Sequence, residues 1–116
     1  MERKVVVLVR QAGLGEVRPD DQAFGLEMLD LFLHAVEGQA AKLHAMCFYT
    51  EGVRLVCEGS PVLASLQLLA GMGVRLVVCG TCLGHFGLSD KVAVGEVGGM
   101  KDIVGLLMEA GHVITV

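Results

Sequence analysis

The chain has 116 residues, 53% hydrophobic and 19% charged, with a formal net charge of −4, and this length suits one domain with its own core over residues 1–116. Its nine basic residues form no stripe, no uncharged apolar run reaches the roughly 18 residues of a membrane span, and the apolar run after Met-Glu-Arg-Lys is too short for a signal peptide, so we expect no nucleic-acid partner, no membrane segment and no secretion. We therefore expect a cytoplasmic protein whose surplus apolar surface forms a subunit interface in a homo-oligomer.

The chain begins with the pattern of a buried strand followed by a loop. Residues Lys4 to Arg10 are β-branched and apolar, which is typical of a central strand in a parallel sheet. The loop from Gln11 to Asp20 contains Gly13-Leu14-Gly15 but lacks the third glycine of a dinucleotide-binding turn, and no P-loop motif occurs in the sequence. We therefore expect no cofactor.

An amphipathic helix is predicted next, from about Ala23 to Glu37. Asp20 or Asp21 is placed to cap its start, where a carboxylate is favourable, and Gly38 is placed to end it. The residues expected on its apolar face recur at helical spacing and are Phe24, Met28, Leu31, Phe32 and Ala35.

The middle of the chain repeats this order of strand and helix. A second strand is expected from Leu43 to Tyr49, and the apolar residues 53–57 form either a continuation of this strand or a connecting turn. Ser60 and Pro61 are typical of the cap and first residue of a helix, which we expect to run to about residue 70. A third strand follows from Val74 to Val78.

Two more strands are predicted in the last third of the chain. Residues Val92 to Val94 are expected to form a short fourth strand, followed by a loop from Gly95 to Gly99, and His112 to Val116 a fifth strand. Between them, a helix is predicted from Met100 to Ala110, with an apolar face of Ile103, Val104, Leu107 and Met108. The alternation of strands and helices predicts an α/β protein with a mostly parallel sheet covered by helices on both faces.

The chemistry is expected where the third strand ends, at Cys79-Gly80-Thr81-Cys82. In open α/β sheets, ligands gather beyond the carboxyl ends of the strands. A thiol attacks as its thiolate, and the start of a helix favours that anion. With Thr81 capping a short helical turn, Cys82 would be its first residue, and we predict that Cys82 is a sulfur nucleophile or carrier. His85 lies three residues further on, where it would stabilise a thiolate or carry a proton.

Burial is the default expectation for the other cysteines, because cysteine is among the most buried residue types. Cys79 is expected on the strand end, near the core, and Cys47 inside an apolar strand. Cys57 precedes a helix at the carboxyl side of a strand, where it is either buried or faces the same crevice as Cys82. A single CxxC without a second pair is a weak zinc signal, so we expect no metal.

Several segments of the second half resemble the DsrE-like domain of the YedF selenium-metabolism proteins. These segments are Glu58-Gly59-Ser60-Pro61-Val62-Leu63, Val78-Cys79-Gly80-Thr81-Cys82-Leu83, Gly87-Leu88 and Lys91-Val92-Ala93-Val94-Gly95-Glu96-Val97. The resemblance implies a single DsrE-like domain over residues 1–116, with a three-layer α/β/α fold and a five-stranded parallel sheet. It also implies membership of a superfamily whose members pass persulfide sulfur between cysteines and often form homo- or hetero-oligomers.

The resemblance also bears on individual residues. Cys79 and Cys82 match the family motif, and Glu58 and Glu96 match it without an assigned role. Gly84 and His85 stand where the family has an acidic residue and then an aromatic one. YedF-like proteins usually carry a TusA-like domain with a Cys-Pro motif, which this sequence does not contain. The resemblance therefore implies that a sulfur donor or acceptor would be a separate, TusA-like protein.

Four functions remain open at this point. The first is a sulfur or selenium carrier or transferase, in which Cys82 accepts sulfur as a persulfide and Cys79 resolves it. The second is a redox protein that uses the CxxC pair as a dithiol. The third is a non-catalytic oligomeric binding module of the same fold, with buried thiols. The fourth is a metal site that adds Cys57 or His85 to the CxxC pair, although four chelating residues are not apparent.

Overall fold

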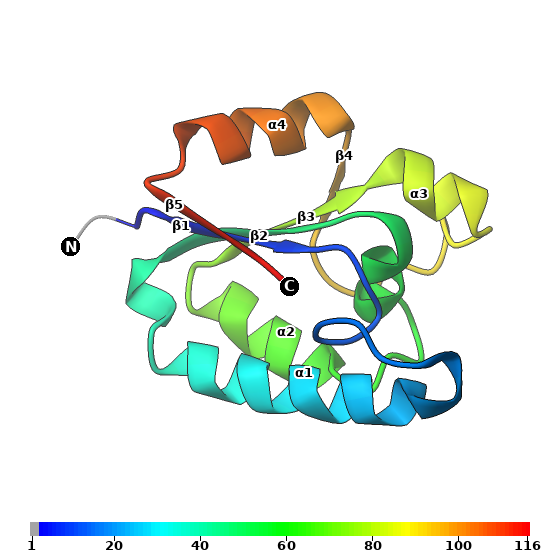
Figure 1. Ribbon diagram of the computed structural model, residues 1–116. Coiled ribbons are helices and arrows are strands. Elements are labelled where there is room, and N and C mark those ends of the chain that lie inside the picture. The colour runs from blue at the N-terminus through cyan, green and yellow to red at the C-terminus, as the bar shows by residue number, and fades with distance from the viewer. Residues whose placement is uncertain (1–2) are drawn as a thin grey trace.

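The computed structural model describes residues 3–116 and contains a five-stranded sheet between two layers of helices (Figure 1). The strands run in the order β4-β3-β2-β1-β5, and every neighbouring pair is parallel. Their bounds are β1 (Val5–Val9), β2 (Leu43–Phe48), β3 (Arg75–Cys79), β4 (Glu96–Gly98) and β5 (His112–Thr115). The predicted α/β fold with its five-stranded parallel sheet is confirmed.

Helices cover both faces of the sheet, as predicted. Helices α1 (Gln22–Glu37) and α2 (Leu63–Gly71) lie on one face and α4 (Met100–Glu109) on the other, while the short α3 (Gly80–His85) follows β3 directly (Figure 1). Three 3₁₀ helices complete the chain: η1 (Pro19–Asp21), η2 (Ala40–Lys42) and η3 (Thr50–Val56). Within residues 3–116, none of these helices combines the length and the apolar character needed to cross a bilayer.

The three central strands are buried along nearly their whole length. In β1, β2 and β3 a single residue of each strand is not buried, which is typical of strands covered by helices on both faces. Phe48 on β2, Leu29 on α1 and Ile103 on α4 are among the largest fully buried side chains, so the core contains residues from all three layers. Because these three strands are parallel, their carboxyl ends lie at the same edge of the sheet, and the core on both faces holds them there.

The buried face of α1 differs from the predicted one. Gly25, Leu29 and Leu33 are buried, whereas Phe24 and Leu31 are exposed. A close contact selects this face, because the backbone of Gly13 lies so near Gly25 that a Cβ on Gly13 would be 3.0 Å from the Gly25 carbonyl carbon. The prediction was wrong because apolar residues occupy more than one side of this helix and the sequence does not show which side meets the loop.

Helix α4 also presents a different face from the predicted one. Ile103 is buried as expected, but Leu106 is its buried companion, and Val104 and Met108 are exposed. The start of the helix is fixed by Asp102, whose carboxylate accepts a hydrogen bond from the Gly99 backbone N–H at 2.8 Å. Because Val104 and Met108 are exposed, the outer face of α4 carries apolar side chains.

The fourth strand lies at Glu96–Gly98 and not at Val92–Val94, which was predicted as a strand. Val92 instead forms an isolated antiparallel bridge with Cys57, and the Ala93 N–H donates to the Val56 carbonyl at 2.8 Å. The chain then turns at Gly95, whose φ of +92° favours glycine. The predicted strand is therefore a segment that crosses η3, and the residues expected to form a loop pair with β3.

Two predicted helix starts are also corrected. Helix α2 begins at Leu63 rather than at Pro61, because the Ser60 hydroxyl accepts a hydrogen bond from the Val62 N–H at 3.3 Å and so caps a turn before the helix. Asp21 precedes α1, but its side chain makes no capping hydrogen bond. Residues 53–57, for which a strand and a turn were both open, belong to η3 and its end. Gly38 ends α1 as expected.

Candidate functional site

The carboxyl ends of β1, β2 and β3 meet at one edge of the sheet, and Cys82 lies beyond this edge. The Tyr49 N–H donates to the Val9 carbonyl at 3.1 Å, which ties the end of β2 to the end of β1. Beyond the edge, η3 follows β2 and α3 follows β3, and these two short helices pack against each other. The site is thus formed by two turns that the parallel sheet brings together.

Cys82 contacts the backbone of the first residue of η3. The Thr50 N–H donates a hydrogen bond to Cys82 Sγ at 3.1 Å. Thr50 has a φ of +47°, in the left-handed region that a β-branched residue rarely adopts. Its hydroxyl donates to the Arg10 carbonyl at 2.7 Å, and the Tyr49 carbonyl, at 2.8 Å, is the alternative acceptor.

Of the four cysteines, Cys82 is the one that is not buried, and all four are free thiols. Cys47 lies within β2 and is fully buried, as expected. The Cys57 thiol is buried as well and donates to the Val53 carbonyl at 3.3 Å, so it points into η3 and not toward Cys82. Reagents and partners in solution therefore reach the sulfur of Cys82 first.

Cys79 lies directly beneath this accessible thiol. It is 1% exposed, near the core as expected, and its thiol is close enough to that of Cys82 to raise the pKa of Cys82. Because α3 begins at Gly80, the residue before the helix is Cys79 and not Thr81, so Cys82 is the third helical residue and not the first. The two thiols form a buried and an exposed member of one pair.

The protonation of Cys82 differs from what the sequence suggested. Burial raises the pKa of the Cys82 thiol above its ordinary value of 9.0, and so does the neighbouring Cys79 thiol, while the Thr50 N–H lowers it without reversing the shift. The expected stabilisation of a thiolate by the start of the helix is therefore wrong for this reduced pair.

The contact that His85 makes is with Phe86 and not with the sulfur of Cys82. The His85 side chain is exposed, and its ring packs edge-on against Phe86 with 5.0 Å between the ring centroids. The Phe86 ring lies under the Arg54 guanidinium, 4.3 Å from its carbon, and Arg54 pairs with Glu51 at 2.5 Å. His85 thus belongs to a polar and aromatic rim beside the site.

The sequence did not reveal Thr50 or this rim. Thr50 acts through a backbone N–H that every residue except proline possesses, so its type carries no signal. The contact between Arg54 and Phe86 joins η3 to the residue just after α3, 32 residues later in the sequence. The sequence hinted at this contact only by placing both segments after the ends of strands. Of the two glutamates in the family motif, Glu96 pairs with Arg75 on β3, and the Glu58 N–H donates to the Lys91 carbonyl at 2.8 Å.

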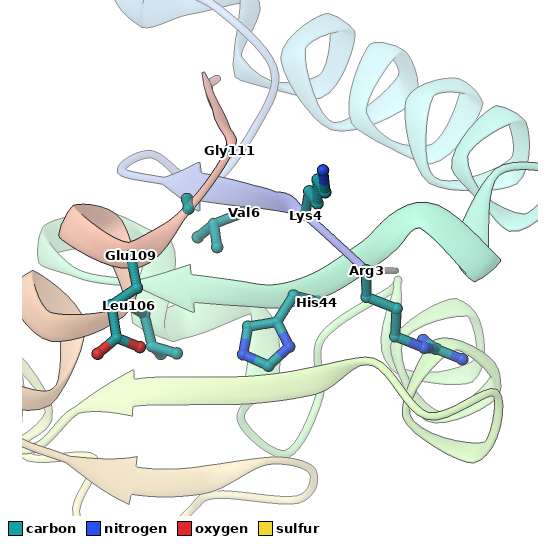
Figure 2. Close-up of a pocket in the computed structure, with 8 residues that line it drawn as sticks. Arg3, Lys4, Val6, His44, Leu106, Glu109 and Gly111 are labelled. Atoms are coloured by element: carbon teal, nitrogen blue, oxygen red, sulfur yellow. The ribbon is translucent and has the colours of Figure 1, made fainter. Parts of the chain in front are cut away.

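Within residues 3–116, no three His, Cys, Asp or Glu side chains are grouped so that they could hold a metal ion. A cavity of about 390 Å³ lies at the opposite end of the sheet, where Figure 2 shows His44 between Leu106 and Arg3. The Arg3 guanidinium donates to the carbonyls of three residues, Ala40, Leu43 and Met72. Arg3 therefore ties loops together at this end, far from the cysteine pair.

Comparison with known proteins gives a family and a fold. A model of the DsrE/DsrF-like family matches residues 18–116. The chain is similar to the solved structure of the YchN protein from Escherichia coli, with 18% sequence identity and a TM-score of 0.72 over 99% of this chain and 100% of that one. It is also similar to MTH1491, a protein of unknown function from Methanobacterium thermoautotrophicum, with 22% identity and a TM-score of 0.73 over 99% of this chain and 100% of that one. A third similar structure is BT1422, a conserved protein of unknown function from Bacteroides thetaiotaomicron, with 14% identity and a TM-score of 0.66 over 97% of this chain and 95% of that one. At these identities the likeness shows the fold alone. No curated protein matches the chain.

Proposed function

Because this chain belongs to the DsrE/DsrF-like family, which is associated with sulfur relay, we propose that it is a sulfur carrier or sulfurtransferase whose acceptor is the Cys82 thiol. The observation that carries this proposal is that Cys82 is the one cysteine of four that is not buried. It lies beyond the carboxyl ends of three parallel strands, where α/β proteins place their ligands.

The proposed step is the transfer of one sulfane sulfur atom, and selenium would follow the same chemistry. The Cys82 thiolate attacks the outer sulfur of a donor persulfide, R–S–SH. A bond forms between Cys82 Sγ and that sulfur, the S–S bond of the donor breaks, and the donor leaves as R–SH with the proton that Cys82 gave up. The product is a persulfide on Cys82, which an acceptor thiol removes in the same way.

Cys79 provides a second exit for the sulfur. Its thiol contacts that of Cys82, so after ionising it is placed to attack the inner sulfur of the persulfide. A Cys79–Cys82 disulfide forms, and the outer sulfur leaves as hydrogen sulfide with the proton from Cys79. Two equivalents of a small thiol such as glutathione then restore the dithiol.

The same contact between thiols supports a second candidate function, a dithiol redox protein. Here Cys79 and Cys82 would exchange a disulfide with a partner without holding sulfane sulfur. The two functions differ in their need for Cys79, because a carrier can be loaded on Cys82 alone and a redox pair needs both thiols. Titration of the thiols in graded glutathione buffers measures how readily the pair is oxidised.

The experiment that tests the carrier is intact-mass analysis after incubation with a persulfide donor. We expect wild type and Cys79→Ser to gain the mass of one sulfur atom, and Cys82→Ser to gain none. Cys57→Ser is the matched control, because Cys57 is a free but buried thiol, and it should be loaded like wild type. Absence of a gain in both wild type and Cys79→Ser would overturn the carrier function.

The proposal extends to partners and location. DsrE/DsrF-like proteins often form oligomers, and we include self-association of this chain in the proposal. A sulfur donor or acceptor would be a separate, TusA-like protein. We place the chain in the cytoplasm, where reducing conditions keep such thiols free.

A further inference from the structure

Thr50 combines two features that rarely occur together. Within residues 3–116 it is the one residue other than glycine with a positive φ, and it is β-branched, so its backbone conformation is strained. Such strain persists where the surrounding structure holds it, and it occurs most often at functional sites. Here the strained residue is the one whose N–H donates to Cys82 Sγ.

The surroundings hold this conformation from two sides. The Thr50 hydroxyl donates to the carbonyl of Arg10 at 2.7 Å, which fastens η3 to the end of β1. Two residues later, Gly52 lies against the backbone of Val9, where a Cβ would be 2.3 Å from the carbonyl oxygen. The first turn of η3 is thus fixed to β1, and its leading N–H is directed at the sulfur on α3.

We propose that Thr50 is a positioning residue, whose hydroxyl anchors the turn so that its backbone N–H stabilises negative charge on the sulfur of Cys82. A charged acceptor makes such a hydrogen bond stronger than a neutral one. The part of this inference that concerns a persulfide rests on the proposed sulfur transfer. The part that concerns the thiolate does not, because any reaction of Cys82 as a nucleophile passes through that anion.

Among residues 3–116, the charged side chains near Cys82 are engaged elsewhere. The elements packed against Cys82 carry Glu51 and Arg54 on η3, His85 on α3, and Arg75 and the Cys79 thiol on β3. Arg75 begins β3, at the end away from Cys82, and pairs with Glu96. Glu51 and Arg54 pair with each other, His85 packs against Phe86, and Cys79 raises the pKa of Cys82. The Thr50 N–H is the group that lowers this pKa, so its loss should be measurable.

The test compares Thr50→Ala, Thr50→Gly and Thr50→Ser in the full chain. The rate at which iodoacetamide alkylates Cys82 is followed across pH by mass analysis of the peptide that contains it. Thr50→Ala removes the anchoring hydroxyl, and Thr50→Gly removes it while relieving the strained φ, which keeps the test valid if the alanine variant folds poorly. Thr50→Ser restores the hydroxyl without the methyl group. Thermal unfolding followed by circular dichroism reports whether each variant folds.

In Thr50→Ala and Thr50→Gly we expect the midpoint of the pH–rate profile to move up and alkylation at neutral pH to slow by about threefold, since fewer thiols ionise although each thiolate is more reactive. Thr50→Ser should match wild type. A merely structural role would instead expose the sulfur and speed its alkylation at every pH. The inference is overturned if the Ala and Gly variants keep the wild-type midpoint. This readout needs no persulfide, so failure of the proposed sulfur transfer would show separately, as absence of sulfur loading in both wild type and Cys79→Ser.

Discussion

At the scale of single residues, position within the sheet decides what each thiol can do. Cys47 lies in the middle of β2, paired with Leu8 on β1 and Val77 on β3, and is sealed from solvent. Desolvation raises the pKa of Cys47 from its ordinary value of 9.0 to about 11. Cys82 lies beyond the strands, where solvent and one backbone N–H reach it. The same side chain is therefore buried packing in one place and a partly exposed thiol in the other.

The raised pKa of Cys47 predicts a loss of stability in alkali. In the unfolded chain this thiol ionises near its ordinary value of 9.0, and in the folded chain at about 11, so between these values the unfolded state binds fewer protons. The contribution of Cys47 to stability is complete below pH 9 and falls as the pH rises toward 11, with a loss of about 1 kcal/mol near pH 10.

Urea unfolding of wild type and Cys47→Ala, at neutral pH and near pH 10, measures this effect. Cys47→Ala should be less stable at neutral pH, because it leaves a cavity, but should lose less stability on going to alkaline pH. The variant keeps some alkaline loss, because burial also raises the pKa of Cys57 and that of Cys82. Equal losses in the two proteins would contradict the prediction.

The sequence predicted part of this residue chemistry. It predicted Cys82 as the reactive cysteine, which stays a prediction, and Cys47 as packing, which its burial confirms, because the first follows a strand end and the second lies inside an apolar run. It did not predict that the pKa of Cys82 is raised, since that shift depends on how deeply the turn is buried and on the neighbouring Cys79 thiol. The sequence also could not identify Thr50 as the hydrogen-bond donor, because Thr50 donates through its backbone N–H and nearly every residue has that group.

At the scale of elements, the strands that the core buries were predictable, whereas the edge strand was not. In each of β1, β2 and β3 all residues but one are buried, and their short apolar runs favoured buried strands of a parallel sheet. β4 is Glu96-Val97-Gly98, none of it buried, and its apolar content is lower than that of Val92-Ala93-Val94 just before it. Backbone pairing with β3, together with the Arg75–Glu96 ion pair across the two strands, places β4 where hydrophobicity alone does not.

The contact between η3 and β1 gives a prediction at this scale. Gly52 is buried against Val9, and a Cβ there would lie 2.3 Å from backbone oxygen, which no side-chain rotation can relieve. Gly52→Ala should therefore push η3 away from the sheet and destabilise the protein by about 2–4 kcal/mol. Because η3 carries Thr50, the Cys82 sulfur should also lose its N–H donor.

Gly105→Ala is the matched control for Gly52→Ala. Gly105 lies within α4, and a Cβ there would have no neighbour within 4 Å, so this substitution should stabilise the protein by about 0.5–1 kcal/mol through helix propensity. Urea unfolding of both variants and wild type provides the comparison. The account of η3 would be wrong if Gly52→Ala unfolded at the urea concentration of wild type.

At the scale of the whole molecule, apolar side chains remain on the surface after the core is complete. On α4, Met100, Val104 and Met108 recur every fourth residue on the outer side of the helix, and Met108 is 81% exposed. We call these three residues the α4 stripe. The opposite layer exposes apolar side chains as well, with Phe24 and Leu31 on α1, Leu68 on α2 and Met72 just after α2, but they are divided between two helices.

The α4 stripe predicts where the proposed self-association occurs. Methionine side chains adapt to irregular surfaces, and a contiguous exposed apolar region marks an interface more often than scattered single residues do. A carboxylate buried in such an interface without a partner is costly, so Met108→Glu should weaken association by at least about tenfold.

Leu31→Glu is the matched control, because it adds the same charge at an exposed apolar position on the other side of the sheet. Sedimentation equilibrium should show an oligomer for wild type and Leu31→Glu and a shift toward monomer for Met108→Glu. A wild type that stays monomeric at every concentration would contradict self-association. Dissociation by Leu31→Glu alone would place the interface on another surface than the α4 stripe. The next surface to alter would then be the edge strand β5, where Val113 and Ile114 are exposed.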